Sequence, residues 1–238
     1  MPPHDTADIG ASGAAPTRPA VALPAPAMLY DQPMAPNPRR LNIAIAEKGL
    51  TIPRTAVDLM AGEHKAEGYL AAVGVPVVPA LVLEDGTVLT ETVAIARYLD
   101  AICPEPNLCG RTPLETAEIE MWQRRVEFGL FQSVAACFRH TNRHLAVLED
   151  QVAAWGEINR GRIRGHLERL DARLAGRTWL AADRLSVADI TAIVAVEFMR
   201  VIKEPLPGSD PGDLMHLAAW VARMQARPAV TASHPQKK

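Results

Sequence analysis

One stretch, residues 78–99, constrains the fold more than any other part of the sequence. It contains two short apolar runs around a turn that carries Asp85-Gly86, and an Asp-Gly pair in this setting is the strongest short-range signal for a β-hairpin. Thr90 or Thr92 then precedes an apolar helical pattern and can cap it. Pro79 stands before the first run, and an X-Pro bond is the only one at which a cis peptide is cheap. The stretch therefore predicts a hairpin, a helix and a cis bond between Val78 and Pro79.

The residues before this stretch alternate between strand and helix patterns. Asn37-Pro38 indicates a helix N-cap followed by the first helical residue, and Gly49 ends that helix. With the hairpin included, the order strand, helix, strand, helix, hairpin, helix predicts a thioredoxin-like α/β domain over residues 27–103. The other expected elements are strands at 27–30 and 55–59 and a short helix at 66–72.

The rest of the sequence carries helical patterns only. A Pro-rich linker over residues 104–112 leads into a capping box at residues 112–115, with proline at the first helical position. Ser186 and Asp189 form a second box, in which Asp takes the place that Glu usually holds. We predict an all-helical domain over residues 113–238. Apolar residues at helical spacing mark its core-facing sides: Ile119, Trp122, Val126, Leu130, Val134, Ile158, Ile163, Leu167, Leu170 and Leu174.

Charge and composition narrow the range of partners. Twenty-five basic and 27 acidic residues give a formal net charge of −2, which suggests neither nucleic acid nor an anionic membrane as a partner. No apolar run approaches the roughly 20 residues of a membrane helix. The three cysteines show no C-x-x-C pair and no zinc spacing, so we expect a reducing cytoplasm and no metal site. Residues 1–26, rich in Ala and Pro, are expected to form a disordered tail.

The pattern V-P-x-L-x-L-x-D-G-x-x-L-x-E-[ST]-x-A-I-x-x-Y-L of residues 78–99 resembles the glutathione half-site of the cytosolic glutathione S-transferases. The resemblance implies the glutathione transferase fold, a thioredoxin-like domain followed by an all-α domain, with glutathione as co-substrate. It implies a cis bond before Pro79 and pairing of the Val78 backbone with the cysteinyl part of glutathione. It also implies that Glu91 and Thr92 hold the γ-glutamyl group at a helix N-terminus.

The loop after the first predicted strand narrows the resemblance from the whole family to one branch of it. Most glutathione transferases carry a Tyr, Ser or Cys there to stabilise the thiolate, the form of a thiol that attacks electrophiles, whereas residues 34–38 contain no hydroxyl or thiol. Three features resemble those of a bacterial and fungal branch of the family, typified by the yeast enzyme Gtt2. They are the prolines of this loop, G-E-H-K at 62–65 and F-x-H at 138–140. The resemblance associates that branch with thiol activation through helix-borne side chains and a bound water. It implies Asn37 and His140 as catalytic candidates; the alternatives are a plain helix cap and a surface histidine.

The resemblance also assigns residues to the glycine end of glutathione and to the pocket for the second substrate. It implies that His64 and Lys65 bind the glycine carboxylate of glutathione, the alternative being a solvated loop. Arg40 is expected to reach the ligand or a partner subunit. A pocket for an apolar electrophile is expected along the long helix, although core packing explains the same residues as well: Met34, Phe128, Phe131, Phe138, Met199 and Arg200.

Two functions fit this sequence. The first is an enzyme that conjugates glutathione to apolar electrophiles or uses it to reduce peroxides. The second is a non-catalytic ligand-binding or interaction module on the same fold, since a fold alone does not establish an activity. The retained half-site favours glutathione binding, whereas the missing hydroxyl keeps the second function open. The resemblance further implies a two-fold homodimer.

Overall fold

The computed structural model describes residues 22–210 and 212–234. Most of the expected tail therefore lies outside the described residues. The fold nevertheless begins earlier than expected, because β1 starts at Pro26 and the Tyr98 hydroxyl donates a hydrogen bond to the Pro24 carbonyl (2.5 Å). The chain is thus fixed to the fold two residues before the sheet.

A four-stranded sheet in the order β2-β1-β3-β4 forms the first part of the fold. Strands β1 and β2 are parallel, whereas β1 with β3 and β3 with β4 are antiparallel, as the predicted hairpin requires. The strands are β1 (Pro26–Asp31), β2 (Arg54–Ala56), β3 (Ala80–Leu83) and β4 (Val88–Leu89), and the helices are α1 (Pro36–Glu47), α2 (Glu67–Val73) and α3 (Thr92–Ile102). The predicted thioredoxin-like order is present, with β2 shorter than expected and shifted toward the N-terminus.

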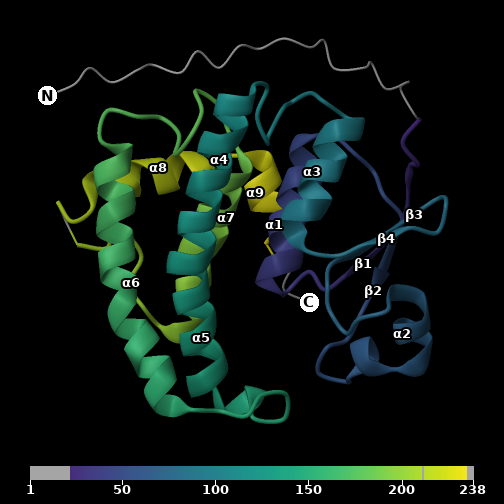
Figure 1. Ribbon diagram of the computed structural model, residues 1–238. Coiled ribbons are helices and arrows are strands. Elements are labelled where there is room, and N and C mark those ends of the chain that lie inside the picture. Colours follow the sequence, from purple (N-terminus) through teal and green to yellow (C-terminus); the bar gives the residue numbers. More distant parts are fainter. Residues whose placement is uncertain (1–21, 211, 235–238) are drawn as a thin grey trace, which may run out of the picture.

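The second part is helical. Figure 1 shows its helices on one side, the strands and α2 on the other, and α1 and α3 between them. Its elements are α4 (Pro113–Val126), a π-helical segment η2 (Glu127–Phe131), α5 (Gln132–Thr141), α6 (Ala153–Leu174), α7 (Val187–Phe198), α8 (Met215–Gln225) and α9 (Pro228–Ala232), with short 3₁₀ turns η3 (Arg143–Leu145) and η4 (Met199–Ile202). No helix among the described residues is long and apolar enough to cross a bilayer.

Helix α7 is the centre of the helical part. Eleven of its twelve residues are buried, and it contacts both α4 and α1. Its start is the predicted capping box of Ser186 and Asp189. The buried Asp189 carboxylate also accepts from the Leu180 N–H (2.9 Å) and from the Trp220 indole N–H (3.2 Å). Burial raises the pKa of Asp189, while these bonds act in the opposite direction.

Three expectations about helix starts and faces are wrong. Helix α1 begins at Pro36 with Ala35 as its N-cap, so Asn37 is the second helical residue; Pro36 takes the first position because its fixed φ suits it. The capping box at α4 is only half present, because the Glu115 carboxylate accepts from the Arg111 N–H and not from that of the cap. Ile158 lies 51% exposed on α6, outside the core.

Candidate glutathione site

The N-termini of α1 and α3 meet at the expected half-site. The Thr92 hydroxyl donates to the Asn37 carbonyl (3.3 Å), which ties the two helix ends together. Glu91 is the N-cap of α3 and has a φ of 66°, so the prediction that Thr90 or Thr92 caps this helix is wrong. That conformation is uncommon for a residue with a side chain, and such residues cluster at functional sites. The exposed Glu91 carboxylate therefore lies at two positive helix ends, where a ligand with an ammonium and a carboxylate group can bind.

The orientation of the Asn37 side chain is fixed by Arg40. Arg40 Nη2 donates to Asn37 Oδ1 (2.7 Å). A guanidinium has no acceptor, so the amide oxygen must face it, and the Asn37 amide N–H₂ group points away from Arg40. Among the described residues this group donates to no other atom. Both residues lie in the first turns of α1, beside Thr92.

Two prolines limit the backbone donors at this helix end. Pro36 and Pro38 have no N–H, and the Arg39 N–H already bonds the Ala35 carbonyl (3.1 Å). Within residues 22–210, the Asn37 N–H donates to no other group. Asn37 thus offers both the one orphan backbone N–H of the first turn and a side-chain donor, which together suit a developing anion.

The start of β3 is built as predicted. The Val78–Pro79 bond is cis. The Tyr69 hydroxyl of α2 donates to the Val77 carbonyl, and its ring packs edge-on against Tyr30 of β1 (centroids 5.3 Å apart). Burial, the larger cause, and the neighbouring Tyr30 raise the pKa of Tyr69 to about 12, so it stays a donor at neutral pH. Tyr30 itself packs against the small apolar cluster that includes Tyr69.

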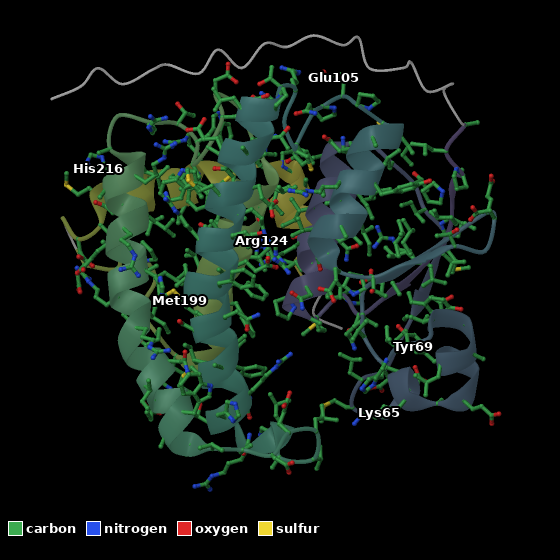
Figure 2. All side chains as sticks on the ribbon, viewed as in Figure 1. Lys65, Tyr69, Glu105, Arg124, Met199 and His216 are labelled. Carbon is green, nitrogen blue, oxygen red and sulfur yellow. The ribbon has the colours of Figure 1, made fainter. Side chains whose placement is uncertain are left out.

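His64 and Lys65 lie in a single 3₁₀ turn, η1 (Glu63–Lys65), before α2. Figure 2 shows Lys65 and Tyr69 near each other at the end of the molecule that carries α2. Lys65 is exposed, whereas His64 is 91% buried and its Nδ1 has no partner among the described residues. Burial, and secondarily Lys65, lower the pKa of His64, so this turn presents one cation and one neutral ring.

His140 lies at the end of α5, half-buried against the start of α6. Its Nδ1 accepts from the Val152 N–H (3.1 Å), so the neutral ring carries its proton on Nε2. None of the bonds among the described residues joins His140 to Asn37 or Glu91. The structure therefore brings Asn37, Thr92 and Glu91 together and leaves His140 on another element.

The residues expected around an electrophile divide into two groups. Met34 and Phe128 are 69% and 67% exposed, whereas Phe131 and Met199 are buried in the core. Phe138 is half-buried, and its ring packs edge-on against that of Phe198 (5.3 Å), while Arg200 is exposed. Core packing thus accounts for Phe131 and Met199, and only the exposed side chains are free to meet a second substrate.

Sequence reasoning missed the groups that hold Arg40. This side chain was expected to reach the ligand or a partner subunit, but it is 5% exposed and bonds Glu127 of η2 (2.9 Å) and Thr191 of α7 (3.4 Å). Burial, the largest cause, lowers the pKa of Arg40, while the bond to Glu127 acts in the opposite direction. The signal that could have pointed to Glu127 was Gly129, since a glycine inside a predicted helix marks an irregularity or a close contact.

All three cysteines are free thiols. Cys109 and Cys137 are buried, and burial raises the pKa of both, that of Cys109 to about 12 with the help of Asp100. The Cys103 thiol donates to the Glu105 carbonyl (3.3 Å) in the linker.

Comparisons with known proteins agree with this arrangement. Residues 35–102 match the family model of the glutathione S-transferase N-terminal domain, and residues 153–223 match that of the C-terminal domain. The chain belongs to the glutathione S-transferase family; it is an enzyme of that family and uses glutathione as its co-substrate.

Its relatives include glutathione S-transferase 2 of Saccharomyces cerevisiae, to which it is 36% identical over 207 residues, 85% of this chain and 87% of the yeast protein. The crystal structure of Gtt2 from the same yeast is similar with a TM-score of 0.80, covering 87% of this chain and all of that one. A glutathione S-transferase domain-containing protein of Marinobacter aquaeolei has a TM-score of 0.79 at 38% identity, over 85% of this chain and 99% of that one. The resemblance of the sequence to the Gtt2 branch is confirmed.

Proposed function

We propose that this glutathione S-transferase transfers the thiolate of glutathione to small apolar electrophiles, with reduction of peroxides as a second activity of the same site. One observation carries the proposal: at the junction of α1 and α3, Asn37 offers a backbone N–H without a partner in the described part of the chain, and a side-chain amide donor, beside Glu91 and Thr92. Such donors stabilise a thiolate and lower its pKa.

The proposed binding mode follows the chain from one end of glutathione to the other. Glu91 accepts from the γ-glutamyl ammonium, and the N-terminus of α3 with Thr92 binds the adjoining carboxylate. The Val78 backbone pairs with the cysteinyl part. Lys65 and the His64 ring, which donates an N–H while neutral, bind the glycine carboxylate. His140 acts on the thiol through a water that its Nε2–H orients.

The two proposed activities, conjugation and peroxide reduction, are separated by a conjugation assay with chlorodinitrobenzene and a peroxidase assay with an organic hydroperoxide. The same assays test the alternative of a non-catalytic binding module, which the sequence suggested because residues 34–38 contain no hydroxyl or thiol. We expect saturable turnover that depends on glutathione. Tight glutathione binding in calorimetry without turnover in either assay would support the binding module.

Glu91→Ala tests the glutathione-binding half. The change removes an acceptor for the ligand's ammonium, and a hydrogen bond to a charged group contributes roughly 1.5–3 kcal/mol. We expect glutathione affinity, measured by calorimetry, to fall about ten- to a hundredfold. Glu84→Ala, which removes an exposed carboxylate from the hairpin turn, is the matched control and should bind normally. Unchanged affinity in a folded Glu91→Ala protein contradicts the assignment.

We also propose a two-fold homodimer in a reducing cytoplasm. The apolar side chains on α4 and η2 that face solvent support the first part: Leu114 is 78%, Met121 39% and Phe128 67% exposed. A second copy that covers them gives each chain a hydrophobic contact. Light scattering at micromolar concentration should give about twice the 25.7 kDa of one chain. A single-chain mass under these conditions counts against the dimer.

A further inference from the structure

Arg40 links the thiol end of α1 to the helical part of the molecule. Its guanidinium donates to Asn37 Oδ1 (2.7 Å) with Nη2 and to Glu127 Oε1 (2.9 Å) with Nη1. Its Cζ lies 4.4 Å from the centroid of the Phe131 ring, a cation–π distance. The side chain is 5% exposed, so these contacts are shielded from water and fix its position.

The partner of Arg40 comes from the irregular segment of the long helix. Glu127 and Phe131 are the first and last residues of the π-helical η2, and π-helical turns occur often at functional sites. A Cβ on Gly129 would lie 2.7 Å from the His166 ring of α6, so the segment is fitted against its neighbour. The second oxygen of Glu127 accepts from Arg124 (3.1 Å), which leaves the carboxylate little freedom to turn.

We propose that Glu127 is a positioning residue for thiol activation: by holding the Arg40 guanidinium, it keeps the Asn37 amide turned with its N–H₂ group toward the glutathione thiol. The inference rests on the proposed role of Asn37. Without Glu127, Nη1 of the guanidinium keeps only the longer bond to Thr191 (3.4 Å), and the orientation that aims Nη2 at the amide oxygen is lost. The Asn37 side chain is then free to rotate, and its donor no longer points at the sulfur.

The direction in which the pKa of the bound thiol changes shows whether Glu127 acts by positioning Asn37 or only through its negative charge. Removing a negative charge near the site favours the thiolate and lowers the thiol pKa. Losing an aimed donor disfavours the thiolate and raises that pKa. Glu127→Ala removes charge and anchor together, whereas Glu127→Gln removes the charge but keeps an oxygen that accepts from Arg40.

The test is an ultraviolet titration of bound glutathione with pH, since the thiolate absorbs and the thiol does not. We expect Glu127→Ala to raise the bound thiol pKa by roughly one unit and to lower kcat with little change in KM for glutathione. Glu127→Gln should restore a pKa at or below that of the unmodified protein. Glu168→Ala, which removes a glutamate from an exposed ion pair on α6, is the matched control and should titrate normally.

Arg40→Lys gives a second line of evidence if Glu127→Ala does not fold. Lysine keeps the positive charge but lacks the fork that binds Asn37 and Glu127 together. We expect its thiol pKa to rise as well. A lowered or unchanged thiol pKa in Glu127→Ala or in Arg40→Lys, or equal values for Glu127→Ala and Glu127→Gln, overturns the positioning role.

The Asn37→Ala variant distinguishes the failure of this inference from that of the proposed function. If Asn37→Ala raises the thiol pKa and Glu127→Ala does not, the thiol site stands and the positioning role fails. If neither variant shifts it, Asn37 is not the donor and both fail. The double variant Asn37→Ala/Glu127→Ala completes the test. If its thiol pKa equals that of the single variant Asn37→Ala, Glu127 acts only through Asn37 and the inference is supported.

Discussion

Asn37→Ala is expected to raise the pKa of the bound glutathione thiol by roughly one to two units and to lower kcat about a hundredfold. The lost amide donates to the sulfur only when the sulfur is charged, so KM for glutathione should change far less than kcat. At neutral pH a smaller fraction of the ligand is ionised, so part of the lost rate should return as the pH is raised through the new pKa. Stopped-flow turnover and ultraviolet titration measure the two effects.

Asn42→Ala is the matched control for this change. Asn42 lies on the same helix, but its side chain bonds Asp31 (3.1 Å) and Arg54, away from the helix N-terminus. The Asn42→Ala variant should leave the pKa of the bound thiol unchanged. His140→Ala is the companion variant: a raised pKa supports the water-mediated role, and a normal one identifies His140 as a residue that only joins α5 to α6. An unshifted pKa in both Asn37→Ala and His140→Ala would contradict the proposed site.

Asp189→Ala should lower the free energy of unfolding by roughly 3–5 kcal/mol. The carboxylate is fully buried and accepts four hydrogen bonds, from the N–H groups of Leu180 and Ser186, the Ser186 hydroxyl and the Trp220 indole. Alanine leaves all four donors unsatisfied in the core. Urea unfolding followed by circular dichroism measures the loss. Asp183→Ala, at a side chain that is 93% exposed, should stay within about 0.5 kcal/mol, and equal midpoints for the two variants would contradict the prediction.

Local signals in the sequence predict much of this fold. The hairpin, the cis bond before Pro79 and the Ser186–Asp189 box each depend on residues that are neighbours in the chain, so the pattern alone contains them. The start of α1 was missed by two residues because two prolines compete for its first turn. Pro36 takes the first helical position and moves Asn37 from cap to helix interior.

The rest depends on contacts between distant residues. In a regular helix Phe128 and Phe131 share a face, yet one is 67% and the other 3% exposed, because the π-helical segment shifts the helix phase between them. That segment is fitted against His166 on another helix. The Arg40 contacts span 87 residues to Glu127 and 151 to Thr191. The apolar periodicity of a single helix cannot predict contacts between residues so far apart in the sequence.

The buried cysteines have a consequence for chemical selectivity. The proposed activity exposes the protein's own cysteines to electrophiles, which any thiolate of the chain could attack. Cys109 and Cys137 are shielded, and their raised pKa values keep them protonated at neutral pH. Arylating reagents and disulfides therefore find poor nucleophiles at both positions. Burial of these two side chains, with Asp100 beside Cys109, therefore slows modification of the protein by electrophiles at both positions.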